Sequence, residues 1–260
     1  MSTEPSRAAT REAMRLFRAA LFILPALTLG LTLGTGSTVR DGIFVAVLLG
    51  TLPLLSMAQV PLLDRTGIQR LAAYKGSITT LTVLGVAALV FGGVGPGFDA
   101  MGLSWTLDAQ ALWTTVGLAA GIALLGVTFS LGREVLGLEE SDLLTELIPR
   151  TGREKRSFAL LSLAAGVFEE VVYRGYLIAV LAPIFSGPWS AALASSLAFS
   201  LLHAYQGPVG IVRSGLMGFL FAAAFILYGS LWPLIAVHVA VDLFSGLILG
   251  PRMLPREEIP

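Results

Sequence analysis

The sequence of 260 residues contains no cysteine and only two histidines. Without cysteine, disulfide bonds, a thiolate nucleophile and cysteine-ligated metal sites are all excluded. Charged residues are also scarce: they make up 13% of the chain, against roughly 25% in soluble domains. The formal net charge is zero, so the composition gives no indication of a nucleic-acid partner. Hydrophobic residues reach 55% and the mean hydropathy is +0.81, which predicts a polytopic membrane protein embedded in the lipid bilayer.

Long apolar stretches recur along the chain, separated by short polar breaks. Each stretch is close to the length that an α-helix needs to cross a bilayer. We therefore predict an all-α fold with eight transmembrane helices. The predicted spans cover residues 16–34, 42–63, 78–94, 111–131, 158–181, 189–204, 209–227 and 231–249.

The positions of lysine and arginine provide an independent test of this count. These residues gather in both terminal tails and in the second and fourth connections, whereas the alternate connections hold only Arg40. By the positive-inside rule, the cationic side faces the cytoplasm, so both termini are predicted to be cytoplasmic. An even number of spans is then required, and eight satisfies that requirement.

We predict one membrane domain organised around these spans. Its parts are a cytoplasmic tail (residues 1–15), four N-terminal spans (16–131), a cytoplasmic amphipathic segment (132–157), four C-terminal spans that hold the catalytic cavity (158–249) and a second cytoplasmic tail (250–260). The segment 132–157 mixes leucines with acidic residues, among them Glu139 and Glu140, which is typical of a helix on the membrane surface. In the outer connection, residues 101–105 are expected at the membrane interface.

Three ionisable residues lie inside the fifth predicted span: Glu169, Glu170 and Arg174. A charge at such depth costs at least about 2.5–3.5 kcal/mol, so it is retained only where it is paired or lines a wet cavity. On a helix, Glu170 and Arg174 share a face, whereas Glu169 points about 100° away. Arg174 would neutralise Glu170 and leave Glu169 less compensated, as suits a general base. An ion pair that merely ties helices together is the structural alternative.

Both histidines also lie in predicted spans. His203 follows Phe199 by four residues on the sixth span, and His238 precedes Asp242 by four on the eighth, so each pair shares a helix face. Counting residues puts Glu169 near mid-membrane, His203 near the cytoplasmic end and His238 nearer the outer end. Straight helices with these bounds would not bring the two histidines to one level.

Two chemistries fit this set of residues. In the first, Glu169 and His203 activate a water that attacks a peptide carbonyl, while His238 and Asp242 stabilise the oxyanion or the leaving amine. In the second, Glu169, His203 and His238 ligate Zn²⁺ and leave a fourth position to water. The chain lacks the His-Glu-x-x-His spacing of zinc peptidases, which favours the version without a metal cofactor and leaves zinc as the alternative.

Taken in order, Glu169-Glu170-x-x-x-Arg174, Phe199-x-x-x-His203 and His238-x-x-x-Asp242 resemble the motif set of the CPBP family. This family comprises CAAX proteases, bacteriocin-processing enzymes and abortive-infection proteins, and it includes the Ras-converting enzyme. The resemblance covers about residues 157–247; the first four spans match only as hydrophobic helices. Three motifs in order on separate spans are a far stronger signal than any one of them.

The resemblance implies an intramembrane glutamic endopeptidase with a cavity open toward the cytoplasm and the bilayer. It gives Glu169 the role of activating water with help from His203, and it gives His238 and position 242 the oxyanion site. Glu170, Arg174 and Phe199 would support them. It also implies a peptide or protein substrate, either lipidated or membrane-embedded, and a place in the bacterial cytoplasmic (inner) membrane. The other functional classes left open are a proton-coupled transporter and a non-catalytic immunity or scaffold protein.

Position 242 departs from the family pattern, in which many members have asparagine. An ionised carboxylate cannot donate a hydrogen bond to an oxyanion. We therefore expect Asp242 to orient His238 and to favour its charged form, a role that suits the four-residue spacing.

Overall fold

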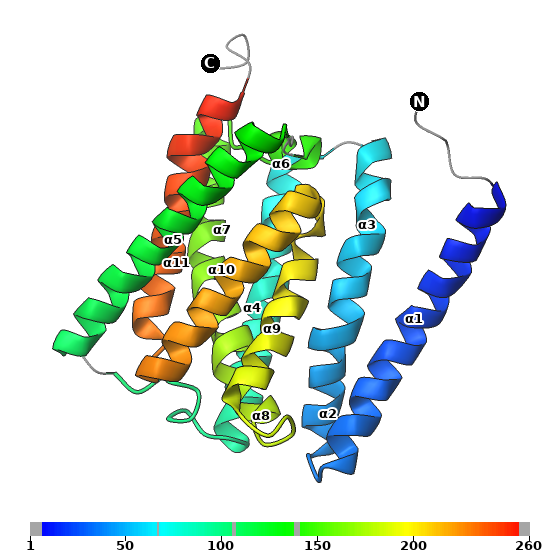
Figure 1. Ribbon diagram of the computed structural model, residues 1–260, viewed down its shortest axis with the longest axis vertical. Helices are drawn as coiled ribbons and strands as arrows, with labels where there is room; N and C mark the ends of the chain where they lie inside the picture. The colour runs from blue at the N-terminus through cyan, green and yellow to red at the C-terminus, as the bar shows by residue number, and fades with distance from the viewer. Residues whose placement is uncertain (1–6, 67, 106–107, 138–140, 255–260) are drawn as a thin grey trace.

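The computed structural model describes residues 7–66, 68–105, 108–137 and 141–254, and within these residues the fold is entirely helical (Figure 1). Several helical segments follow one another without a break and form long continuous rods. The elements are α1 (Arg7–Gly34), α2 (Val39–Ala46), η1 (Val47–Thr51), α3 (Leu52–Thr66), α4 (Arg70–Val94), α5 (Ala109–Leu136), α6 (Asp142–Glu146), α7 (Gly152–Glu169), η2 (Glu170–Tyr176), α8 (Leu177–Leu181), α9 (Pro188–Leu202), η3 (Ala204–Gln206), α10 (Gly207–Tyr228), α11 (Trp232–Phe244), η4 (Ser245–Leu249) and η5 (Gly250–Met253).

Five helical runs within the described residues are long and apolar enough to cross a membrane, as expected of an integral multi-pass membrane protein. They cover Val39–Pro61, Arg70–Val94, Ala109–Leu136, Ala204–Tyr228 and Trp232–Met253. Two shorter apolar helices, Ala19–Gly34 and Pro188–Leu202, coincide with the first and sixth predicted spans. The fifth predicted span is absent from both groups, and it is the span that carries Glu169, Glu170 and Arg174 in its middle.

Among the described residues, the π-helical segments are η1, η2 and η4. None of them was predicted from the sequence. Segments of this kind are rare in proteins and occur frequently at functional sites. Here η2 begins directly after Glu169 and contains both Glu170 and Arg174, so the acidic motif straddles the change from α- to π-helix.

The connections at the two ends of the bundle pack more closely than the sequence predicted. In the segment 132–157, the only helix between α5 and α7 among the described residues is the five-residue α6, and Leu143 and Ile148 are buried; Leu138, Glu139 and Glu140 lie outside the described residues. At the other end, the first two residues of the expected interfacial stretch enter the bundle, whereas Trp105 is 65% exposed. Met101 is fully buried, and the Gly102 carbonyl accepts a hydrogen bond from the Leu231 amide at 2.8 Å.

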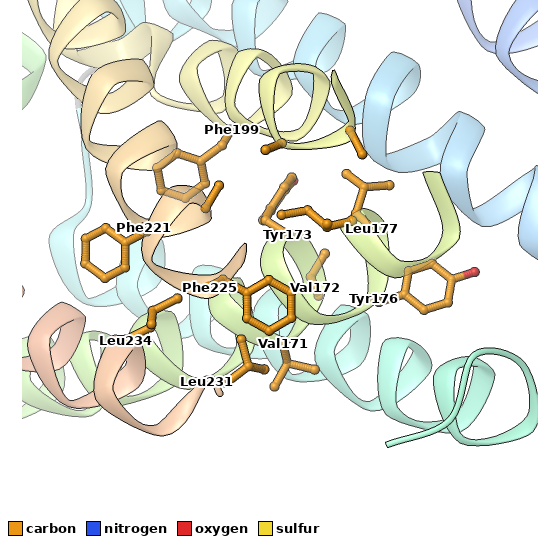
Figure 2. Packing of buried hydrophobic residues seen from close by; sticks show 14 of the residues in the cluster. Val171, Val172, Tyr173, Tyr176, Leu177, Phe199, Phe221, Phe225, Leu231 and Leu234 are labelled. Atoms are coloured by element: carbon orange, nitrogen blue, oxygen red, sulfur yellow. The ribbon is translucent and has the colours of Figure 1, made fainter. Parts of the chain in front are cut away.

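The hydrophobic core surrounds η2 and α8. Figure 2 shows Val171, Val172 and Tyr173 of this rod facing side chains of α9, α10 and α11, among them Phe199 and Phe221. The long rod α7–η2–α8 is therefore enclosed on several sides by other helices. A polar side chain on its inner faces is shielded from both lipid and bulk water.

A capping box fixes the start of α7. The Glu154 amide donates to the Thr151 hydroxyl at 3.2 Å, and the Glu154 carboxylate accepts from the Thr151 and Arg150 amides at 2.8 and 2.9 Å. Burial alone would raise the pKa of the Glu154 carboxyl, but these hydrogen bonds and the nearby Arg70 hold that pKa below its ordinary value of 4.5. The cap therefore anchors the end of the rod that carries the acidic motif.

We expect Glu154→Gln to lower the free energy of unfolding near neutral pH by about 1 kcal/mol, because a neutral amide accepts these hydrogen bonds less strongly. Since the pKa of Glu154 is lower in the folded state, its stabilisation is present above 4.5 and is lost as the pH falls through the lowered value. Thermal unfolding in detergent at several pH values measures the gap between wild type and variant. Glu134→Gln, at an exposed position on α5, is the control; a gap that does not shrink in acid would contradict the assignment.

Candidate active site

A buried ion pair forms the base of the site. The Arg174 guanidinium donates through Nη1 to Glu170 Oε1 at 2.9 Å and through Nη2 to the Gly218 carbonyl of α10 at 3.1 Å. The Glu170 and Arg174 side chains are 0% and 1% exposed. The guanidinium also lies over the rings of Phe199 and Phe221, at 4.6 and 5.4 Å from their centroids. The charge of Arg174 is thus compensated by a carboxylate, a carbonyl dipole and two aromatic faces.

His238 on α11 binds the same carboxylate oxygen. Its Nδ1 lies 2.6 Å from Glu170 Oε1, and because an ionised carboxylate only accepts, Nδ1–H must be the donor. The other ring nitrogen, Nε2, faces Glu169 Oε2 at 3.7 Å and Asp242 Oδ2 at 3.8 Å. We expected Asp242 to orient His238, but the short orienting hydrogen bond is the one that His238 Nδ1–H donates to Glu170. Asp242 lies beyond hydrogen-bond distance of the ring.

Neighbouring Glu169 and Glu170 occupy different environments, in line with their expected separation around the helix. Glu170 is enclosed, whereas the Glu169 side chain is 16% exposed and Asp242 is 35% exposed. Separations of 3.7 and 3.8 Å from His238 Nε2 are too long for direct hydrogen bonds, and one bridging water spans such distances. Glu169, Asp242 and His238 therefore form the open side of the site.

His203 packs against the ring of Phe199. The His203 and Phe199 rings are 4.6 Å apart and the Phe199 and His238 rings 6.5 Å apart, so both imidazoles lie near the same phenyl ring. His203 Nδ1–H donates to the Phe199 carbonyl at 2.8 Å, which leaves Nε2 as an acceptor. Among the described residues, His203 makes no hydrogen bond or ion pair with Glu169. The nearest imidazole to Glu169 is His238.

Of the two histidines, which were expected at different depths, only His238 is seen to contact the two glutamates among the described residues. His238 comes within contact of the acidic motif of α7 and η2, because the two helices pack closely. A Cβ atom at Gly166 would lie 2.4 Å from the Val239 side chain, so only glycine permits this approach. His203 stays at the C-terminal end of α9, where the Leu202 carbonyl accepts a hydrogen bond from Ser56 at 2.8 Å.

The zinc alternative requires Glu169, His203 and His238 to converge on one ion. In the described part of the chain, no group of three or more histidine, aspartate and glutamate side chains is arranged to hold a metal. In this structure, Glu169, His203 and His238 therefore do not form such a group.

Two features of the site were not predicted from the sequence. The Tyr173 hydroxyl is buried and has no hydrogen-bond partner among the described residues; its place within the acidic motif, four residues after Glu169, was the available signal. In addition, Tyr176 at the end of η2 donates to Asp41 Oδ1 of α2 at 2.8 Å. The N-terminal spans thus reach the acidic segment through a buried aspartate, although they carry little charge elsewhere.

Comparison with known proteins agrees with the motif resemblance. Residues 155–244 match the family model described as type II CAAX prenyl endopeptidase Rce1-like. No curated protein and no solved structure matches the chain. The matched residues include both glutamates, Arg174, both histidines and Asp242, so the match and the spatial cluster coincide. Over this segment, the chain is similar to the type II CAAX prenyl endopeptidases of the Rce1-like family.

Proposed function

We propose that this protein is an intramembrane endopeptidase that cleaves a peptide bond with a water activated by Glu169. The observation that carries the proposal is the arrangement around His238: two carboxylates, Glu169 and Asp242, face one imidazole nitrogen within an apolar bundle. The family match supports the same activity, since the matched proteins are CAAX-type endopeptidases. A structural ion pair alone would need only Glu170 and Arg174, and the additional groups on the open side would have no purpose.

In the proposed mechanism, Glu169 takes a proton from the water as the water oxygen attacks the carbonyl carbon of the peptide. His203 Nε2, which its Nδ1–H bond leaves unprotonated, accepts a hydrogen bond that helps to orient this water. The carbonyl π electrons move to the oxygen and form a tetrahedral intermediate. When the C–N bond breaks, the proton on Glu169 passes to the leaving amine.

His238 supports the developing oxyanion in this scheme. With Nδ1–H held by Glu170, a protonated ring presents Nε2–H on the open side of the site as a donor. Asp242 cannot donate as a carboxylate, so its proposed role is to stabilise the positive charge of His238 from 3.8 Å. Arg174 holds Glu170 in place, and Glu170 in turn fixes the orientation of the His238 ring.

We also propose that all eight predicted segments cross the bacterial cytoplasmic membrane with both termini in the cytoplasm. In Figure 1 the beginning of α1 and the end of η5 lie at the same end of the bundle, which an even number of crossings requires. The start of α4 and the helix α6 lie at this end too; Arg70 and Lys75 lie in the first turns of α4, and Arg150, Arg153 and Lys155 follow α6. The substrate would reach the site from the cytoplasmic side or from the bilayer.

Replacing the proposed base provides the main test. We expect Glu169→Gln to lower kcat by at least about 10²-fold, because an amide cannot accept the proton of the water. Purified protein in detergent, incubated with a peptide library and read by mass spectrometry, measures the cleavage. The matched control is Glu134→Gln on the exposed face of α5, which should cleave as wild type does. Equal traces for wild type and Glu169→Gln would remove the protease hypothesis and favour a transport or scaffold role.

Substitutions at His238 and Asp242 on α11 distinguish the residue that stabilises the oxyanion from the residue that stabilises the charge of the imidazole. We expect His238→Ala to lose most of the activity, about 10²-fold or more in kcat, because the donor to the oxyanion is removed. Asp242→Asn should retain substantial activity, since Glu170 still holds Nδ1–H of the ring. Steady-state kinetics on the same library peptide gives both values. The reverse ranking would show that position 242 itself contacts the reacting atoms.

Metal dependence is a separate prediction. We expect active, purified protein to contain no stoichiometric zinc and to keep its activity in chelator, because no group of three or more histidine, aspartate and glutamate side chains among the described residues is arranged to hold a metal. Elemental analysis and activity before and after dialysis against chelator measure this. Zinc at one equivalent, with activity lost on chelation and restored by zinc, would establish the alternative mechanism.

A further inference from the structure

A chain of three polar side chains crosses the turn between α9 and α10. Arg213 Nη2 donates to Gln206 Oε1 at 3.1 Å, and Gln206 Nε2 donates to the Tyr205 hydroxyl oxygen at 3.1 Å. A guanidinium has no acceptor atom, so the amide oxygen of Gln206 must face Arg213 and its nitrogen must face Tyr205. The direction of the chain is thereby fixed, and Tyr205 receives a hydrogen bond through its oxygen.

Because the hydrogen bonds run from Arg213 through Gln206 to Tyr205, the hydroxyl proton of Tyr205 is the last donor in the series. Within the described residues, the Tyr205 O–H makes no hydrogen bond as a donor. Each hydrogen bond in such a chain polarises the next, and a guanidinium at its start strengthens the effect. The Tyr205 hydroxyl is therefore a strengthened donor that has no acceptor in this part of the protein.

Tyr205 adjoins the candidate active site. It follows His203 by two residues, and the two rings lie 6.1 Å apart at an angle of 33°. Glu169 and Asp242 are close enough for their charges to act on its hydroxyl, although they belong to α7 and α11. The tyrosine thus lies beside the imidazole of His203, which follows the last residue of α9.

The backbone holds this chain in place. Gly207, with φ of +76°, makes the sharp entry into α10. At Gly210, an added Cβ atom would lie 2.2 Å from Gln206 Cβ, so the side chain of Gln206 packs directly against the first turn of the helix. The glutamine that links Arg213 to Tyr205 is consequently held in position before any substrate binds, as preorganised catalysis requires.

The proposed reaction lacks a second donor to the oxyanion. Asp242 as a carboxylate only accepts, and the free nitrogen of His203 is an acceptor because its Nδ1–H donates to the Phe199 carbonyl. On the exposed side of the site, His238 is then the one proposed donor. We propose that Tyr205 is a further catalytic residue, whose hydroxyl, polarised through Gln206 by Arg213, donates a hydrogen bond to the carbonyl oxygen of the scissile peptide bond.

This inference rests on the proposed endopeptidase function and deepens it. The hydroxyl keeps its proton throughout: it forms one hydrogen bond to the carbonyl oxygen, which strengthens as negative charge develops in the tetrahedral intermediate. No bond of the substrate is broken by Tyr205 itself. Loss of such a donor should therefore appear in kcat and leave KM nearly unchanged.

Two variants of the protein test the donor and its direction, on the library peptide that wild type cleaves fastest. Tyr205→Phe should lower kcat by about 10²-fold with KM within about twofold of wild type. Gln206→Glu keeps the size of the side chain but replaces the donor beside Tyr205 by an acceptor. Tyr205 would then donate to the introduced carboxylate, so we expect a similar loss of kcat and no further loss in the double variant. Tyr228→Phe, at the opposite end of α10, is the matched control.

A thioamide version of the peptide separates a catalytic from a structural role, because sulfur is a weaker hydrogen-bond acceptor than oxygen. Replacing the scissile C=O by C=S should slow the wild type several-fold more than it slows Tyr205→Phe. The same slowing in both proteins, or a kcat for Tyr205→Phe within about twofold of wild type, would overturn the role of Tyr205 and leave the protease function intact. If wild type cleaves no peptide, the proposed function fails and this role fails with it.

Discussion

The carboxylate of Glu170 is the point at which four helical elements meet. One of its oxygens accepts hydrogen bonds from Arg174 of η2 and from His238 of α11, and Arg174 in turn binds the Gly218 carbonyl of α10 and lies over Phe199 of α9. Removing one member of such a buried pair typically costs about 3–5 kcal/mol, because the other charge is left without a partner. The relative positions of the helices are thus tied to an electrostatic requirement as well as to packing.

This requirement explains the unequal environments of the two adjacent glutamates. Glu170 Oε1 accepts hydrogen bonds from both Arg174 and His238, and the Glu170 side chain is 0% exposed, so this carboxylate is enclosed away from the open side of the site. Glu169 is the last residue before η2 and faces the open side, where its Oε2 lies 3.7 Å from His238 Nε2. Buried charge is tolerated inside the bundle only where it is paired. Glu170 is therefore a structural carboxylate, and the adjacent Glu169 is the one proposed to react.

Local spacing predicted the parts of this arrangement that lie on one helix. The four-residue separation correctly placed Glu170 beside Arg174 and put Phe199 beside His203. It could not show that Glu170, 68 residues earlier in the chain, would hold His238 more tightly than Asp242 does. It also missed η2, whose wider turns no apolar pattern encodes, and the buried bond between Asp41 and Tyr176.

The site has many hydrogen-bond acceptors and few hydrogen-bond donors. Three carboxylates and the free nitrogen of His203 all accept hydrogen bonds, and Arg174 is directed away into its own pairing. An oxyanion placed among acceptors is repelled unless donors with fixed orientation face it. Arg213 can supply such a donor indirectly: it fixes the direction of the Gln206 amide, and the amide polarises the Tyr205 hydroxyl. No further charge is then placed beside the three carboxylates. The chain from Arg213 to Tyr205 has this form, and it keeps the guanidinium away from Glu169, which must remain free to take a proton.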